Sequence, residues 1–369
     1  MKKLNIVLLL TSAAILAACD AKEMVTPDGP VPVRDKVPLQ IVSGIGSTTR
    51  AFDSSWDATD SIGVFTTVAG SGTITMSGTY NDENIRYDIA SAAETYNESA
   101  EEGERNKYKG FAPHSEGSQI YLPADGSNVD VYAYYPWTNG VTASSPLAIS
   151  IPTSQTLANQ KKTDVLMAET LTDLTNNKPI NIDHPSVSLL FRHILSKVII
   201  KVKVGTGYGE TDLKDRIDVK ITGQPINATF QPVGQSFAIT TLTEDFTDII
   251  PYEIPKPVGV ETPDPDYDSS VLYTYRAILL PNDNTTNPAS NTNRKIVFTV
   301  GDKETPGAAQ ITYDYDITTN FVENQQITFT LTLAATGITV EAAITPWTIS
   351  NINPEDSLLP IDDSSSNND

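Results

Sequence analysis

The chain has 369 residues, of which 39% are hydrophobic, so it is long enough to bury about two ordinary hydrophobic cores. Its formal net charge of −21 argues against a nucleic-acid-binding protein, because such proteins carry a basic surface that matches the phosphate backbone. Short segments that alternate apolar and polar residues recur between turn-forming residues, and this pattern predicts an all-β protein.

Residues 1–18 have the features of a lipoprotein signal peptide. Lys2 and Lys3 precede an apolar run at residues 6–18, and this run is too short for a lasting transmembrane helix. Small residues then lead to Cys19, the only cysteine of the chain, which stands where a lipid thioether is made. The alternative interpretation is a buried cysteine within a cleaved signal. Two or more acyl chains on Cys19 would hold the mature protein on a membrane.

A tether at residues 19–36, interrupted by proline and glycine, leads to the first candidate strand. This strand spans residues 37–43, where apolar residues at alternate positions predict one buried face. A flexible loop follows and ends at Arg50, its one basic residue. The order of tether, strand and protease-sensitive loop is unusual.

The rest of the first half predicts strands between polar loops. We expect strands at residues 61–65, 119–123, 129–137 and 164–168. The acid-rich residues 81–109 are predicted to form a long loop. The polar spacer at residues 169–183 predicts a domain boundary, which divides the chain into an N-terminal domain at residues 37–180 and a C-terminal domain at residues 181–349.

The strand predicted at residues 129–137 carries a cluster of tyrosine and tryptophan side chains. Such rings can stack on sugars, but more often they fill a β core or a domain seam. We therefore interpret the cluster as core. Carbohydrate binding through Tyr135 and Trp137 is the alternative.

The second half shows the more regular alternation. Residues 188–204 predict a long strand with a bend near residues 193–196, because the phase of the buried positions changes there. Further strands are predicted at residues 217–222, 271–280, 296–300, 313–318, 327–333 and 338–347. This number of strands suits one β-sandwich, with a similar one before it. The acidic tail at residues 350–369 is expected to be flexible unless a partner orders it.

The sequence shows no pattern that indicates catalysis. The three histidines, His114, His184 and His193, lie far apart and lack the spacing of metal ligands, and His193 in its apolar segment is interpreted as a core histidine. Motifs for a serine nucleophile, a zinc protease or a phosphate-binding loop are not found. The only thiol is predicted to carry lipid. We therefore predict a protein without a cofactor that is not an enzyme.

One acidic segment imitates a calcium-binding loop. Asp264, Asp266 and Asp268 alternate as calcium ligands do, but the sixth place of the loop lacks glycine. The twelfth place is Tyr275, where calcium binding requires a bidentate glutamate. We therefore do not expect a calcium site. A carboxylate pair for glycoside hydrolysis would depend on the fold, and the sequence marks no two acids for that role.

Several segments in order resemble one family, the fimbrillins of the Bacteroidales, whose members build or anchor thin surface pili. The resemblance covers nearly the whole chain and includes the lipoprotein signal. The matching segments are Thr49-Arg50-Ala51, Trp56, residues 60–65, residues 131–136, residues 164–168, residues 191–197, residues 321–333 and residues 344–347.

The resemblance implies two transthyretin-like β-sandwich domains in tandem and export to the outer membrane as a lipoprotein. In polymerising members, an arginine-specific protease cuts after the first strand, and a strand from a neighbouring subunit fills the resulting groove. Arg50 lies where this cut would fall, which would leave Ala51 as the new N-terminus and make residues 37–50 a removable segment. Arg34 precedes the strand and is the poorer candidate.

The expected partners are therefore other pilus subunits, the protease, the membrane through Cys19, and a receptor on a host or bacterial surface. Three alternatives stay open. Arg50 is an ordinary surface arginine in the first of them. In the second, the protein is an anchoring or accessory subunit that keeps its lipid and stays uncut. In the third, it is a surface lipoprotein that binds glycans.

Overall fold

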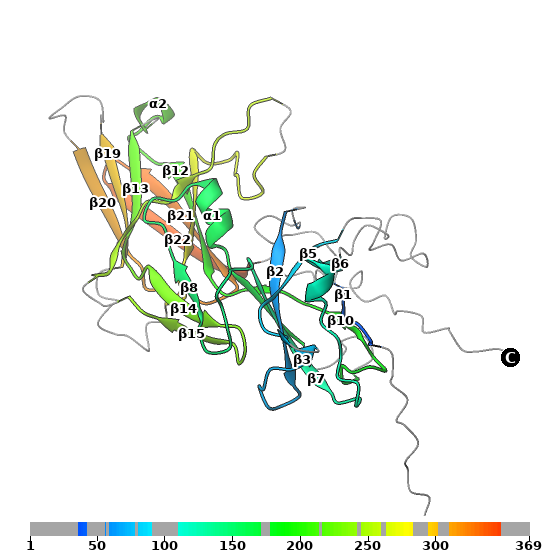
Figure 1. The fold of residues 1–369 in the computed structure, drawn as a ribbon. Coiled ribbons are helices and arrows are strands. Elements are labelled where there is room, and N and C mark those ends of the chain that lie inside the picture. The colour runs from blue at the N-terminus through cyan, green and yellow to red at the C-terminus, as the bar shows by residue number, and fades with distance from the viewer. Residues whose placement is uncertain are drawn as a thin grey trace, which may run out of the picture. The chain divides into compact units, whose positions relative to one another are not determined.

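The computed structural model describes residues 36–42, 56, 59–77, 80–90, 110–170, 178–213, 216–241, 245–259, 263–282, 294–301 and 310–347. Within these ranges the chain is all-β, with two short helices, α1 (Leu157–Thr163) and α2 (Glu210–Leu213), and one 3₁₀ turn, η1 (Glu116–Ser118) (Figure 1). The all-β prediction is therefore confirmed.

The largest sheet has eight strands in the order β10-β1-β6-β5-β2-β7-β9-β11. Its members are β1 (Gln40–Val42), β2 (Ser61–Val68), β5 (Ile85–Ile89), β6 (Gly110–Pro113), β7 (Val129–Tyr135), β9 (Leu166–Thr170), β10 (Ser186–Ser188) and β11 (Arg192–His193). All its pairs are antiparallel except that of β1 with β10, which is parallel. The first strand of the chain thus lies inside the sheet.

The central strands of this sheet are buried on both faces. Ile62 and Val64 of β2 belong to one core cluster, whereas the neighbouring Phe65 belongs to another. In β7, Val131 and Tyr132 divide in the same way. Strands covered on both sides have no solvent face, which explains their nearly continuous apolar sequences.

Two sheets enclose the core of the second half. One has the order β17-β18-β12-β21-β22 and the other β16-β13-β19-β20. Their strands are β12 (Ser196–Val204), β13 (Ile217–Gln224), β16 (Thr247–Ile249), β17 (Tyr252–Glu253), β18 (Tyr273–Leu279), β19 (Lys295–Gly301), β20 (Gln310–Asp316), β21 (Gln325–Ala334) and β22 (Gly337–Pro346). In β21, every second side chain from Ile327 to Leu333 is fully buried, so the alternation read from the sequence marks the core.

The remaining strands form two small sheets. One is a hairpin of β3 (Met76–Ser77) and β4 (Tyr80–Asn81). The other has the order β15-β14-β8, with β8 (Leu147–Ser150), β14 (Asn227–Gln231) and β15 (Ser236–Ile239). The predicted boundary between residues 180 and 181 stays a prediction, and the short strands β10 and β11 beyond it join the eight-stranded sheet.

Two predicted elements are wrong. The long loop expected at residues 81–109 contains β5, whose Ile85, Tyr87 and Ile89 alternate with Arg86 and Asp88 in the period of a strand. The strand expected at residues 119–123 is an irregular segment that makes one isolated bridge, from Tyr121 to Pro38. The predicted bend near residues 193–196 is confirmed, because residues 194 and 195 form a bend that separates β11 from β12.

Candidate functional site: the first strand and the groove that holds it

Residues 36–42 are bonded to the protein along both edges of the backbone. On one edge, Gln40 N donates to the Pro185 carbonyl at 3.0 Å, and β1 continues in register with β10. On the other edge, Leu39 N donates to the Ile120 carbonyl at 2.9 Å and Leu122 N donates to the Val37 carbonyl at 2.9 Å. Further along that second edge β1 pairs with β6. The segment is therefore an interior strand, as Figure 1 shows for β1 between β10 and β6.

The inward side chains of this segment fill an apolar groove. Leu39 and Ile41 are 2% and 4% exposed, and both belong to the core cluster that contains Trp56, Phe111 and Phe191. The Trp56 ring lies edge-on to Phe111 and to Phe191, with 5.2 Å between ring centroids in each pair. These rigid rings give the groove a fixed wall, so its shape does not depend on the strand alone.

Side-chain contacts add little to the hold on this strand. Gln119 Nε2 donates to the Leu39 carbonyl at 3.2 Å, and Ser186 Oγ donates to Gln40 Oε1 at 2.8 Å. The Lys36 ammonium lies 5.2 Å from the centre of the Tyr121 ring. The first strand is therefore bound mainly by backbone hydrogen bonds and by two buried aliphatic side chains, and many other strands could supply both.

The residues predicted to be modified lie outside the described ranges. These are Cys19, Arg50 and Ala51, and the acidic tail at residues 350–369 also lies outside. The predictions made for them stay predictions. The described chain shows the strand upstream of Arg50 in its groove.

Sequence reasoning identified the strand but missed the walls of the groove. The apolar residues Ile120 and Leu122 were visible in the sequence, and both are buried. Their alternation predicted a separate strand, whereas in the structure this segment is hydrogen-bonded beside the first strand. The strand β10 has three residues, too few for periodicity to show. Its pairing with β1 joins distant parts of the sequence, and no local pattern reports such a pairing.

His193 is a satisfied core histidine, as predicted. It is 2% exposed, and its Nδ1 lies 2.8 Å from Oδ1 of the buried Asp164. The Trp347 ring stacks on the imidazole with 3.7 Å between centroids and 4° between planes. His114 instead lies on the surface beside Asp88, at 2.6 Å. The contacts of His193 join β11 to the residues that follow α1 and β22, and the contact of His114 joins the residue after β6 to β5.

The acidic segment that imitates a calcium loop binds side-chain cations. Asp264 and Asp266 each lie 2.9 Å from the buried Arg276 guanidinium, and Asp266 also contacts Lys197 at 3.1 Å. Burial by itself raises the pKa of Asp266, but the charges of Lys197 and Arg276 outweigh it and leave the pKa lowered. Within the described ranges, no group of three or more His, Cys, Asp or Glu side chains is placed to hold a metal ion.

The tyrosine and tryptophan cluster is engaged within the fold. Tyr134 is fully buried, and its hydroxyl donates to Asn84 Oδ1 at 2.8 Å. The half-buried Tyr135 donates to Asp60 Oδ1 at 2.9 Å. Trp137 Nε1 donates to the Asn84 carbonyl at 3.2 Å, and the Arg86 guanidinium lies over its ring. The polar atoms of both candidate sugar-binding side chains therefore already have partners inside the protein.

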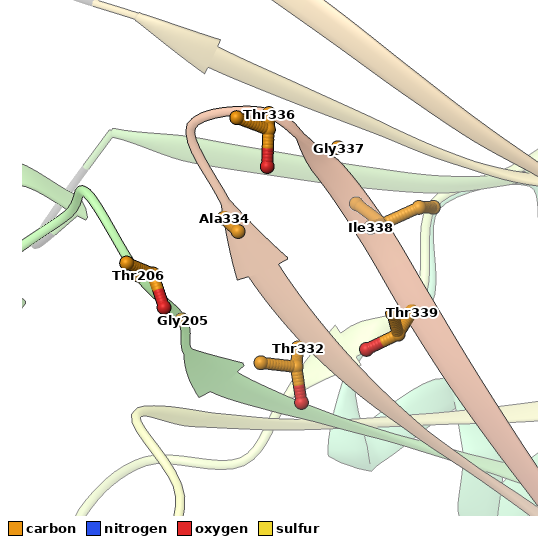
Figure 2. Close-up of a pocket in the computed structure, with 8 residues that line it drawn as sticks. All are labelled: Gly205, Thr206, Thr332, Ala334, Thr336, Gly337, Ile338 and Thr339. Carbon is orange, nitrogen blue, oxygen red and sulfur yellow. The ribbon is translucent and has the colours of Figure 1, made fainter.

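A hollow of about 390 Å³ lies at the tip of the β21–β22 hairpin (Figure 2). Its walls come from the segment after β12, from the end of β21, and from the start of β22. The lining residues are Gly205, Thr206, Thr332, Ala334, Thr336, Gly337, Ile338 and Thr339. The hollow offers hydroxyl groups but no ionisable side chain, so its lining carries no acid–base or metal chemistry.

No described helix has the length and apolarity needed to cross a bilayer, since the longer of the two, α1, has seven residues. Together, the sheets and the first strand in its groove define an all-β protein with an early, interior strand. The fimbrillin-like family profile matches residues 49–347, and the chain belongs to this family. The resemblance read from the sequence is thereby confirmed.

Individual relatives agree with this assignment. A protein of Bacteroides uniformis named "Putative fimbrium subunit Fim1C" is 26% identical over 362 residues, which cover 95% of this chain and 97% of that protein. Two crystal structures described as a "putative cell adhesion protein" share the fold. One, from Bacteroides uniformis, has a TM-score of 0.58 at 22% identity and covers 85% of this chain and 99% of that one. The other, from Bacteroides ovatus, has a TM-score of 0.59 at 19% identity, and the match covers 86% of this chain and 100% of that one.

Proposed function

We propose that the protein is a structural or adhesive subunit of a surface fimbrium, exported as an outer-membrane lipoprotein through Cys19. Membership of the fimbrillin-like family supports this function, and so does the name of the Bacteroides uniformis relative. The lipid attachment rests on the signal peptide and on the single cysteine after it. In this proposal the described strands form two transthyretin-like β-sandwich domains in tandem.

Assembly proceeds by exchange of the first strand. An arginine-specific protease cuts after Arg50, which severs residues 37–50 from Ala51 and leaves β1 held only by non-covalent contacts. Loss of β1 uncovers the groove between β10 and β6, with unpaired backbone groups on both sides and an apolar floor. A neighbouring subunit then supplies a strand with aliphatic residues at the positions of Leu39 and Ile41.

The observation that carries this proposal is the interior position of β1. Loss of an edge strand would uncover one neighbouring strand, whereas loss of an interior strand creates a slot with two edges and a floor. Replacement by an equivalent strand restores the hydrogen bonds and the buried area. The free energy gained when a strand of another subunit fills the empty slot therefore favours assembly of one subunit with the next.

The test uses the chain from residue 20 onward, treated with an arginine-specific protease. We expect one dominant product that begins at Ala51, release of the severed segment, and multimers that grow with time on size-exclusion chromatography. The matched variants are Arg50→Lys, which should stay uncut and monomeric, and Arg34→Lys, which should behave as wild type.

Two results would refute parts of this account. A product that lacks the first strand but stays monomeric at high concentration would exclude strand exchange. Native protein from the cell surface that begins at lipidated Cys19, and not at Ala51, would identify an anchoring or accessory subunit. Loss of membrane attachment in Cys19→Ala, measured by detergent partitioning, tests the lipid separately.

A further inference from the structure

The strand β22 forms an open edge of its sheet. It is the last strand of the order β17-β18-β12-β21-β22, and within the described residues no strand pairs with its outer side. Its ten residues pair with β21 without a bulge. The strand also lacks lysine, and Glu341 is its one ionisable residue. Natural edges are usually shortened, twisted or charged to prevent pairing, and β22 shows none of these protections over most of its length.

The register identifies which backbone groups are available. Trp347 N donates to the Asn324 carbonyl at 2.9 Å, so this pair is hydrogen-bonded and every second pair of the ladder after it is too. The residues between these pairs therefore direct their N–H and C=O groups away from β21. These residues are Ile338, Val340, Ala342 and Ile344.

The same four residues carry the apolar side chains of the strand. Ile338 and Val340 are half-buried against the core, and alternation places Ala342 and Ile344 on the same face. Their cross-strand neighbours Ile327 and Phe329 are fully buried, yet Ile344 itself is 55% exposed. The core of the sandwich is thus incompletely covered along β22.

The opposing sheet also ends beside β22. Its last strand, β20, contacts β22, and the Tyr315 ring lies edge-on to Phe329, the cross-strand neighbour of Ala342. Ile311, at the end of β20 nearer the β21–β22 hairpin, is 49% exposed. Two neighbouring edges therefore leave apolar side chains uncovered. An added strand beside β22 would shield Ala342 and Ile344 and also satisfy the four free backbone positions.

We propose that the free edge of β22 binds an extended segment of another polypeptide. The register gives the chemistry of that segment. Residues directly opposite each other share a face, so the positions facing Ile338, Val340, Ala342 and Ile344 are apolar. The position opposite Glu341 lies on the outer face and carries lysine or arginine. A second copy of this chain is the poorer occupant, because it would bring another formal charge of −21 and its own glutamate.

This docking edge is separate from the groove of the first strand. It needs no cut at Arg50, so it is available in the uncut chain. A result that excludes strand exchange at the first strand would leave binding at the β22 edge untouched. A failure of binding at this edge would likewise leave strand exchange untouched.

The experiment uses the uncut chain and a labelled peptide in which four valines alternate with threonine around a central lysine. Fluorescence anisotropy is expected to show saturable binding, and β22 amides are expected to gain protection from hydrogen exchange. A matched peptide with glutamate in place of the lysine should bind about two- to fivefold more weakly, since like charges face each other. In Glu341→Lys this preference should reverse.

Two variants test the edge itself. Ala342→Pro removes an N–H that points away from β21, so it should abolish binding with little loss of stability. Ile344→Lys places a charge on the uncovered apolar row and should also abolish binding. Ala343→Ser, on the outer face, is the control and should bind as wild type.

Several results would overturn the proposal. These are no saturable binding to the wild-type chain, unchanged binding in both edge variants, or a peptide preference that does not respond to Glu341→Lys. Binding that appears only after deletion of residues 348–369 would show that the chain's own tail occupies the edge. A concentration-dependent dimer lost in Ile344→Lys would instead identify a second copy as the occupant.

Discussion

Truncation of one side chain in the first strand tests how that strand is held. Ile41 is 4% exposed and belongs to the aromatic-walled core cluster, so Ile41→Ala removes three buried carbons without changing a backbone hydrogen bond. Buried Ile→Ala changes cost about 2–5 kcal/mol, and a segment of three paired residues relaxes more easily than a central strand. We therefore expect a loss of about 2–4 kcal/mol in the free energy that holds the strand.

The assay follows from this magnitude. In the uncut chain, the variant should lower the free energy of unfolding measured in urea. After cleavage at Arg50, the same loss should weaken retention of the severed segment by about 30- to 700-fold, measured by mass spectrometry of the released peptide. Gln40→Ala is the matched control, because Gln40 is exposed in the same strand and its change should stay within about 0.5 kcal/mol.

The reasoning would be refuted by equal effects of the two substitutions. It would also be refuted if Ile41→Ala destabilised the protein by less than about 1 kcal/mol, since the groove would then not depend on this contact.

Three further predictions concern buried positions of the fold outside the first strand. Burial raises the pKa of Asp82, despite hydrogen bonds from Ser77 and Thr75, so the folded state holds this proton more tightly than the unfolded chain does. This tighter proton binding stabilises the folded state fully at pH values below the usual aspartate pKa of 3.8, and the stabilisation is lost as pH rises through the pKa of Asp82 in the folded state. Asp82→Asn should therefore gain stability relative to wild type as pH rises, and urea unfolding at several pH values measures this difference. Gly63→Ala should lower the free energy of unfolding by about 1–3 kcal/mol in the same assay, because its Cβ would lie 2.2 Å from Cε1 of Tyr134. Arg276→Met should cost about 3 kcal/mol and lower the melting temperature, because it removes the buried partner of Asp264 and weakens the pairing of Asp266.

The controls for these predictions come from the same chain. Gly117→Ala adds a Cβ that meets nothing within 4 Å and should be neutral, in contrast to Gly63→Ala. Lys220→Met removes a surface ion pair with Asp248 and should cost less than about 1 kcal/mol, unlike the loss of Arg276. A constant stability difference between Asp82→Asn and wild type across pH would contradict the assignment of the raised pKa to burial.

The strands that could be predicted are those whose solvent-facing and buried sides differ. In β21, threonine and glutamine alternate with fully buried Ile327, Phe329 and Leu331, and the period of two is complete. The first strand was predictable for the same reason. Its neighbours were not, because alternation reports which side chains are buried and carries no information on which strand lies beside them.

The two errors have local causes. At residues 119–123 the burial of Ile120 and Leu122 follows the predicted alternation, but Pro123 has no N–H to continue a ladder, and the segment makes a single bridge. In β5, the alternation of Ile85, Tyr87 and Ile89 was present, but the acid-rich sequence after it dominated the composition of the window. Composition over a long window thus hid a short strand.

The helix α1 also escaped sequence reasoning. It has seven residues, so it shows less than two full periods of an amphipathic pattern. Its start is set by a capping box, in which Thr156 and Asn159 satisfy each other's backbone N–H groups. Such a box has few residues and occurs often by chance.

The parallel pairing of β12 with β21 sets the order in which the second half can form. Nine residues of β12, from Ser196 to Val204, must wait for a partner that spans residues 325–333, near the far end of the chain. The central strand β12 is made early and can pair with β18, but the sheet cannot be completed until β21 and β22, its last two strands, have been synthesised. Pairing of β12 with β21 closes a long loop, and such a closure slows folding.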